Sequence, residues 1–476
     1  MAGLFGILNL GQRSLQAQEM GVQVAGHNIA NVSNTAYSRQ RVRVEASQPV
    51  QIGPNIVGTG AQVTAVEQLR NQFLDTQIQK ETSITGFLES RQFALEYAQS
   101  DLGQVIDRMA TGAEGTAAST GVGGQHGIAE NLSGFFAALQ SLSNDPSSAT
   151  ERQNLIDKAK DLATSFQQTD GRLTNLRAAL NSSVSDQVSE ANRLVADIAK
   201  LNDSVANAEL SSSSTANDLR DSRQEKIEAL SKLVDVGTSS GNNGAVNISV
   251  GGTLLVDGRS VQDTLEAYDA GAGQVLVRTK TGATPVSLTS GSVQGTIQSR
   301  DEDVASLQRE LATLAGTIIT EVNAIHKSGY SLGGQTGADF FTGSASGNIQ
   351  VNADLAQDTN RIQASGVSGE SGNNTVVLAM AKLATEPVAS LGHLTISQSY
   401  GQTVANLGQA LSNANAQSSD QKVVTDMLGQ QRNSIGGVSL DEEMTDLVKF
   451  QRAYQASARV ISTVNQLFDE VLNLKR

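Results

Sequence analysis

The Gly-x-Ser-x-Gly pattern at Gly329-Tyr330-Ser331-Leu332-Gly333 has the spacing of a hydrolase nucleophile elbow. Such an elbow requires a strand before the serine and a helix after it. Here the expected order is inverted, because a helical segment precedes Ser331 and a glycine-rich stretch follows it. We therefore interpret this pattern as a turn that ends a helix rather than as a catalytic site.

The other residue types that carry chemistry do not combine into a metal site or a catalytic pair. The four histidines, none of which has a ligand spacing such as HExxH, are His27, His126, His326 and His393. The acidic triplets 301–303 and 441–443 fall at expected helix starts, where carboxylates complement the helix dipole. The absence of cysteine excludes disulfides, thiolate catalysis and cysteine-ligated metals. We expect no enzymatic activity, no metal and no cofactor.

The two ends of the chain are predicted to be helices. Each of them carries a stripe of largely apolar residues with the same spacing. The N-terminal stripe consists of Leu4, Leu8, Gly11, Leu15, Gln18, Val22, Ala25 and Ile29. The C-terminal stripe consists of Leu447, Gln451, Tyr454, Ala458, Ile461, Asn465, Phe468 and Leu472. Nine of these are the apolar interface candidates: Leu8, Leu15, Val22, Ile29, Leu447, Tyr454, Ile461, Phe468 and Leu472. Steps of four and three residues are typical of coiled-coil seams. We predict that these nine residues form an assembly interface, either between the two termini or with copies in neighbouring molecules.

The segments between the stripes alternate between helical and glycine-rich patterns. They indicate a mainly α fold with inserted β structure, composed of paired terminal coiled-coil helices, a helical bundle and an outer β-rich domain. Within the bundle we expect a strand at 41–45, a helix from about 66 to 109 and a linker at 111–127. The expected parts are paired terminal helices at 1–40 and 440–476, a bundle at 41–235, 299–328 and 401–439, and an outer β-rich or mixed domain at 236–298 and 329–400.

Charge and hydropathy narrow the classes of function. The net charge is −14; residues 1–48 carry +2, residues 440–476 carry −1, and the segment between them carries −15. An acidic middle argues against nucleic-acid binding, and near-neutral ends suit close helix packing. No apolar run reaches the length of a membrane span, and the N-terminus lacks the basic residue and cleavage site of a secretory signal peptide. We expect neither membrane insertion nor a cleaved signal.

Two terminal motifs then indicate a family. The segment HNIANVSNTAYSRQ, which contains Asn28, Asn31, Tyr37, Ser38, Arg39 and Gln40, resembles the N-terminal motif of bacterial flagellar axial proteins. Residues 438–474 resemble the C-terminal helix of the same family. Segments 135–148, 217–236 and 245–258 are similar to its hook-associated branch. The family usually has glycine at the position of Ala36, so a left-handed backbone there would be strained.

The resemblance implies a structural protein of the hook–filament junction. It implies helical bundles around a tube of paired terminal helices, with β domains projecting outward. It also implies unfolded export through the flagellar type III apparatus and an extracellular location in the flagellum. The implied partners are copies of the chain in an axial ring, the hook protein, the next hook-associated protein, and an export chaperone bound to the C-terminal helix.

Two alternatives remain open from the sequence. The first is another axial protein, such as a hook or rod protein, which the Ser38-Arg39-Gln40 ending and the internal segments disfavour. The second is a secreted glycan-binding or hydrolytic module carried by the β segments, for which Ser331 and His393 are the only candidate residues.

Overall fold

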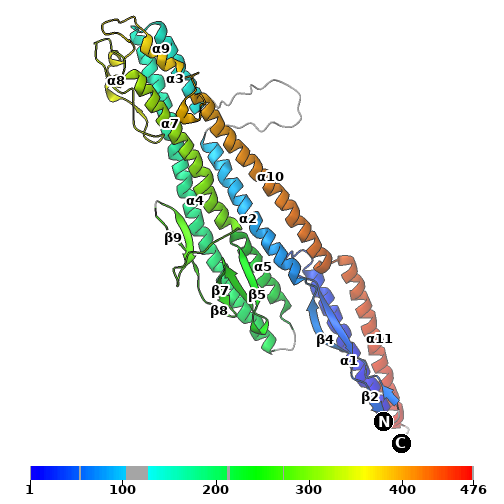
Figure 1. Ribbon diagram of the computed structural model, residues 1–476. Helices are drawn as coiled ribbons and strands as arrows, with labels where there is room; N and C mark the ends of the chain where they lie inside the picture. Colours follow the sequence, from blue (N-terminus) through cyan, green and yellow to red (C-terminus); the bar gives the residue numbers. More distant parts are fainter. Residues whose placement is uncertain (1, 53–54, 103–126, 212–214, 272, 474–476) are drawn as a thin grey trace, which may run out of the picture.

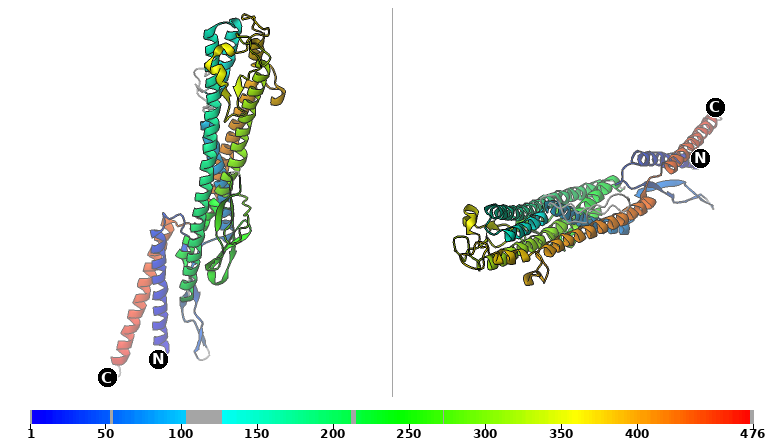
Figure 2. Two further views of the ribbon diagram at one scale, coloured as in Figure 1. Left: turned by 90° about the vertical axis from the view of Figure 1, so that its left-hand side faces the viewer. Right: turned by 90° about the horizontal axis from the view of Figure 1, so that it is seen from above.

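The computed structural model describes residues 2–52, 55–102, 127–211, 215–271 and 273–473. It shows a long helical body from one end of which a pair of helices projects, with both chain termini at the free tip of that pair (Figures 1 and 2). The mainly α fold with inserted β structure and paired terminal helices is therefore confirmed. No helix in these ranges is long and apolar enough to cross a membrane.

Four long helices run along the body (Figure 1). They are α2 (Gln72–Asp101), α4 (Ala149–Ser211), α7 (Ala305–His326) and α10 (Ile396–Gly436). Regularly spaced Leu, Ala and Phe side chains fill the space between them; Leu162 and Phe166 of α4, for example, are fully buried. The predicted helix at 66–109 begins later than expected. Asn71 caps α2 by accepting hydrogen bonds from the N–H groups of Phe73 and Leu74.

The residues before Asn71 form a strand instead. β1 (Gln40–Ala46) pairs antiparallel with β4 (Ala61–Gln68), with an irregularity at Arg43 and Val44, so the strand predicted at 41–45 is confirmed. The ribbon continues in β2 (Val50–Ile52) and β3 (Asn55–Val57). The linker predicted at 111–127 lies, except for its last residue, outside the described residues.

The upper end of the body in Figure 1 is built from residues 128–144 and 327–395 around the ends of α4 and α7. Its elements are α3 (Ile128–Asn144), β11 (Phe341–Thr342), β12 (Gln350–Val351), α8 (Ala353–Gln357) and α9 (Thr375–Lys382). Phe135, Phe340 and Phe341 are fully buried, and the Phe135 ring centroid lies 6.0 and 5.6 Å from the other two. This aromatic contact joins segments that are about 200 residues apart in the chain.

A second group of strands lies at the opposite end of the body, against the second half of α4 (Figure 1). They are β5 (Val236–Ser240), β6 (Val246–Val250), β7 (Thr253–Asp257), β8 (Ser260–Val261), β9 (Leu265–Asp269) and β10 (Val275–Thr279). The first four form one antiparallel sheet and the last two form a hairpin. Helices α5 (Asn217–Leu233) and α6 (Gly291–Gln298) pack beside them.

Segments 236–298 and 329–400, which we grouped into one outer domain, thus lie in different places. The buried residues of the first belong to a hydrophobic cluster with α4 and α5, and those of the second belong to a cluster with α3, α4 and α7. The physical reason is that 329–400 supplies large apolar side chains such as Phe340 and Met380, which fill the core of the bundle rather than a separate sheet.

The expectation that residues 301–303 start a helix is wrong. A π-helical turn, Ser299–Val304, joins α6 directly to α7, so these carboxylates lie inside a continuous helical segment. Asp301 pairs with Arg300, and Asp303 accepts two hydrogen bonds from Arg91 of α2. Ion pairing with arginine, rather than the helix dipole, therefore stabilises these charges. In the described ranges, no group of acidic and histidine side chains could hold a metal.

Candidate assembly site

The terminal helices α1 (Ala2–Ala30) and α11 (Leu440–Asn473) pair antiparallel along their length (Figure 2). Four contacts between them fix one register: Phe5–Phe468, Gly11–Ile461, Ser14–Ser457 and Gly21–Phe450. The ring centroids of the Phe pair are 5.0 Å apart, and the Ser14 and Ser457 hydroxyl oxygens are 2.8 Å apart.

Glycine permits this close approach. A Cβ atom at Gly11 would lie 2.7 Å from the Ile461 side chain, and one at Gly21 would lie 2.6 Å from the Phe450 ring. The small face of α1 therefore receives large side chains of α11.

The nine predicted interface residues fall into two groups in the single chain. Seven are half-buried: Leu8, Leu15, Val22, Ile29, Leu447, Ile461 and Phe468. Tyr454 and Leu472 are exposed, with 41% and 67% of their surface accessible. The most buried positions of α1 are Gly11 and Ala25, which belong to the predicted stripe, and Ala17, Gly21, Val24 and Asn28, each of which directly precedes a stripe residue. The apolar residues chosen as interface candidates thus lie mostly along the border between the helix contact and solvent, and their role in assembly stays a prediction.

Asn28 is the hub of the joint between the helix pair and the body. Its side chain is 1% exposed and makes four hydrogen bonds. Nδ2 donates to the Gln40 carbonyl (2.8 Å) and to Glu443 Oε2 (2.9 Å). Oδ1 accepts from the Tyr37 hydroxyl (2.7 Å) and from the Gln40 N–H (3.0 Å). One amide therefore ties together α1, the following loop, strand β1 and helix α11.

Tyr37 extends this network to the next turn of α1. Its hydroxyl lies 3.0 Å from His27 Nδ1, and the two rings pack edge to face. Because the hydroxyl donates to Asn28, it accepts from the protonated Nδ1 of His27. Burial, together with the negative charges of Asp218, Asp221 and Glu443, raises the pKa of Tyr37, so it remains a neutral donor.

Arg39 binds the first turn of α11. Its Nη1 donates to Glu442 Oε2 at 2.6 Å, and its Nε lies 2.6 Å from Glu443 Oε1. The backbone of Arg39 also donates to the Gly436 carbonyl and accepts from the Leu69 N–H. Since Glu443 is buried and contacts both Arg39 and Asn28, its charge is compensated at the start of α11.

Two carboxylates of α5 attach the motif to the body. Asp221 accepts from the Ser38 N–H (3.1 Å) and from Arg70 Nη1 (2.9 Å). Asp218 accepts from Gln40 Nε2 at 2.8 Å. Arg70 also donates to Asp75 of α2 at 2.7 Å. Burial raises the pKa of both Asp75 and Asp221, so their charges depend on these donors.

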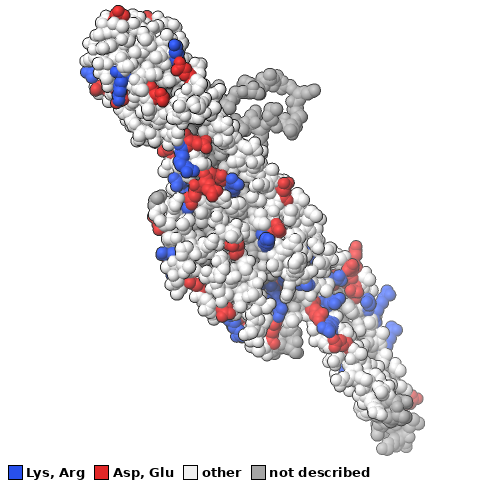
Figure 3. Space-filling model, in the orientation of Figure 1, with Lys and Arg blue, Asp and Glu red and all other residues white. Residues whose placement is uncertain are grey.

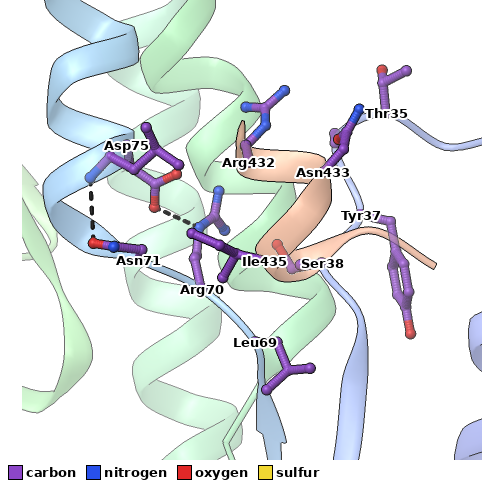
Figure 4. A pocket seen from close by; sticks show the side chains of 13 residues that line it. Thr35, Tyr37, Ser38, Leu69, Arg70, Asn71, Asp75, Arg432, Asn433 and Ile435 are labelled. Atoms are coloured by element: carbon purple, nitrogen blue, oxygen red, sulfur yellow. Dashed lines mark hydrogen bonds and ion pairs between the residues drawn. The ribbon is translucent and has the colours of Figure 1, made fainter. Parts of the chain in front are cut away.

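A small cavity lies at this joint. It has a volume of about 20 Å³ and is bordered by the loop at 35–38, the start of α2 and the end of α10 (Figure 4). Figure 4 shows Arg70 and Asp75, which both border the cavity, joined by their ion pair. That volume suits roughly one water molecule. The family-motif residues thus serve to hold segments together.

Five of the six motif residues take part in this joint. The exception is Asn31, which is less buried and bonds back to the His27 carbonyl. Ala36 is accommodated without strain, because its φ is not positive and its N–H donates to Asn34 Oδ1 in a local turn. Alanine in place of the usual glycine therefore leaves the loop intact.

The free tip of the helix pair carries exposed apolar side chains. They are Phe5, Ile7, Leu10, Val460, Leu467, Val471 and Leu472. Charged residues gather instead near the joint, and the visible face of the tip is mostly uncharged (Figure 3). An apolar surface of this kind is typical of a protein contact.

Ser331 and His393, the candidate catalytic residues, occupy two separate turns. The expected helix-ending turn is confirmed, because α7 ends at His326 and the Ser331 hydroxyl accepts from the Gln335 N–H. His393 occupies a left-handed turn (φ 65°) and is exposed. In the described part of the chain, no hydrogen bond joins its side chain to Ser331. His326 is buried, with Nδ1 bound to the Ala338 carbonyl and Nε2 accepting from the Gln363 N–H.

The sequence reasoning did not identify the body side of the joint. Arg70, Asp218, Asp221 and Glu443 complete the network, yet they are scattered over nearly 400 residues. Asp218 and Asp221 stood in the family-like segment 217–236 without an assigned role, and Glu443 stood in the C-terminal motif, where it was assigned to the helix dipole. Each of these charged residues has other polar residues beside it in the sequence, as on an exposed helix face. The neighbouring sequence therefore does not indicate that the residue becomes buried.

Comparison with known proteins agrees with the architecture. The family model "Flagellar hook-associated protein FlgK helical domain" matches residues 119–341, and "Flagellar basal body rod FlgEFG protein C-terminal" matches residues 430–474. Flagellar hook-associated protein 1 of Bacillus subtilis (strain 168) is 27% identical, and the alignment covers 99% of each chain. The protein of that name from Salmonella typhimurium is 22% identical, covering 98% of this chain and 100% of the relative.

The Salmonella alignment runs over 576 positions, more than the 476 residues of this chain, so that relative carries segments that this chain lacks. Among solved structures, the flagellar hook junction protein FlgK from Burkholderia pseudomallei shares the fold. Its TM-score is 0.62 at 15% identity, covering 76% of this chain and 100% of that one. The chain is thus similar over nearly its whole length to flagellar hook-associated protein 1, and it contains a match to the helical domain of that protein.

Proposed function

We propose that this protein is a structural junction element of the bacterial flagellum, which assembles between hook and filament by packing of its terminal helices. The observation that supports this most directly is the helix pair itself. It projects from the body, holds both chain ends, and exposes apolar side chains at its tip. Exposed apolar side chains do not stabilise a monomer, whereas burying them against neighbouring subunits would stabilise an assembly.

The polar joint supports the same proposal. A helix pair that must pack in a tube needs a fixed direction relative to the body. The hydrogen bonds of Asn28 and the ion pairs of Arg39 and Arg70 supply that constraint with buried, directional contacts. The predicted interface residues, Tyr454 and Leu472 among them, would then contact neighbouring subunits.

The proposal includes the finer assignments of partner and location. The chain would form an axial ring of identical subunits outside the cell, with the hook protein on one side and the next hook-associated protein on the other. Before export, a chaperone would cover α11, whose apolar residues would otherwise be exposed. The terminal helices would pack inward and the acidic body outward.

Deletion of the gene tests the role. Complete hooks without filaments, together with flagellin released into the medium, support the junction assignment. Electron microscopy of isolated hooks and immunoblotting of the medium measure both. Missing hooks would instead indicate a hook or rod protein, and normal filaments would contradict any junction role.

A further inference from the structure

A polar pocket of about 240 Å³ lies on the body beside the joint, between α2, α5 and strand β5. Three arginines line it, Arg70, Arg220 and Arg223, against one carboxylate, Asp75. The rest of its polar lining consists of glutamine amides and of the hydroxyls of Thr76, Thr238, Ser239 and Ser240. The pocket therefore combines positive charge with many neutral hydrogen-bonding groups.

The three arginines differ in their counter-charges. Arg70 bridges Asp75 and Asp221, and Arg220 donates to both carboxylate oxygens of Glu209. Arg223 has no ion pair with any residue in the described ranges, although it is only 6% exposed.

The guanidinium of Arg223 is held only by neutral acceptors. Its Nη1 donates to Asn202 Oδ1 at 2.9 Å and to the Gly244 carbonyl at 2.8 Å. No described residue accepts a hydrogen bond from its Nε or Nη2. Burial lowers the pKa of Arg223 to about 10, which still leaves the side chain charged at neutral pH.

The carboxylate of Glu209 attracts Arg223 without contacting it directly, and Arg220 already forms an ion pair with Glu209. A buried charge without a contacting counter-ion is unfavourable, and the planar guanidinium matches the oxygens of a phosphate or carboxylate. We propose that this pocket binds the oxyanion group of a small polyhydroxylated molecule, with Arg223 as the counter-charge. The volume is below the range of about 300–1,000 Å³ found for drug-sized ligands, which favours a molecule about the size of one sugar ring. The amides and hydroxyls of the lining would bind its neutral hydroxyl groups.

Isothermal titration calorimetry on the full chain tests this proposal. The probes are sodium phosphate, glucose 6-phosphate and glucuronate at pH 7 and constant ionic strength, with glucose as the uncharged control. We expect saturable binding of at least one anionic probe with a Kd of about 1 mM or tighter. The phosphate and carboxylate probes distinguish the two oxyanion classes.

Two variants locate the binding. Arg223→Gln removes the counter-charge, and Thr238→Glu places a carboxylate at the pocket from a half-buried position on β5, so it does not depend on the buried arginine. Both should weaken binding at least about tenfold. Arg193→Gln, at an exposed arginine of α4, and Thr313→Glu, on the exposed face of α7, are the matched controls.

The site is supported if Thr238→Glu loses affinity for the anionic probe while the two control variants keep the wild-type affinity. This comparison remains valid even if Arg223→Gln proves unstable. Absence of saturable binding of all three anionic probes to the wild-type chain would overturn the proposal. Equal affinity of wild type and Thr238→Glu would also overturn it, because the anion would then bind elsewhere.

Discussion

The Asn28 amide donates a 2.9 Å hydrogen bond to the Glu443 carboxylate, across 415 residues of chain. This contact joins the end of the first helix to the start of the last one, at the point where both meet the body. Glu443 is 2% exposed and is compensated by Asn28 and Arg39, so the two terminal helices share one buried charge.

Substitution of Asn28 should loosen the joint. Asn28→Ala leaves the Gln40 backbone, the Tyr37 hydroxyl and Glu443 without their shared partner, which we expect to cost about 3 kcal/mol. Hydrogen exchange of residues 36–47 and 436–447 should accelerate accordingly. Asn31→Ala, in the same motif but less buried and bonded only to His27, is the control. Equal protection in both variants would refute the hub role of Asn28.

The glycine face of α1 gives a second prediction. Gly21→Ala places a Cβ atom 2.6 Å from the Phe450 ring, so the ring must move or the helices must separate. Gly26→Ala has open space and should instead stabilise α1, by about 1 kcal/mol of helix propensity. Opening free energies of α1 from hydrogen exchange should therefore shift in opposite directions. A gain of protection in both variants would contradict close packing at Gly21.

The register of the pair can be trapped covalently, because the chain has no cysteine of its own. The Ser14 and Ser457 hydroxyls are 2.8 Å apart, so Ser14→Cys with Ser457→Cys should form a disulfide under mild oxidation. The product should run as a cross-linked monomer in non-reducing electrophoresis. Ser14→Cys with Ser462→Cys, at an exposed position, should react more slowly. Comparable rates would mean that α1 and α11 do not hold this register.

Much of the fold follows from local patterns, whereas the joint does not. The strand at 41–45 and the terminal helices are predictable because alternation and helical spacing act over a few residues. The triplet at 301–303 was misread because a π-helical turn continues α6 into α7, and the pairing of Asp303 with Arg91 is a long-range contact. Asp221 likewise gains its role from Ser38 and Arg70, far away in the chain.

The predicted stripe illustrates the same limit. Its period correctly located one side of each terminal helix and included Gly11, which meets Ile461, but it did not include Gly21, where the helices also approach closely. A stripe of Leu, Val and Ile draws attention more readily than small residues do, although small residues permit the closest approach. Close helix contacts are therefore underestimated when only apolar side chains are considered.

His326 makes stability depend on pH. Burial lowers the pKa of His326 to about 4, below the unfolded value of 6.5, so the unfolded chain binds the proton more tightly. Its contribution is complete above pH 6.5 and is lost as the pH falls toward 4, by about 3 kcal/mol in total. Urea unfolding at pH 7, 6, 5 and 4 measures this slope. His326→Gln should flatten it and His393→Asn, at an exposed turn, should not. An unchanged slope in His326→Gln would contradict the neutral buried state.

The central claim is that packing of the terminal helices builds the hook–filament junction. Its most direct test is complementation of a deletion strain with Ile461→Asp combined with Phe468→Asp, which places two charges opposite Gly11 and Phe5. Val261→Asp, at an exposed position on β8, is the control. We predict complete hooks, no filaments and released flagellin with the double variant, and normal filaments with the control. Normal filaments with the double variant, at wild-type levels of secreted protein, would contradict the account.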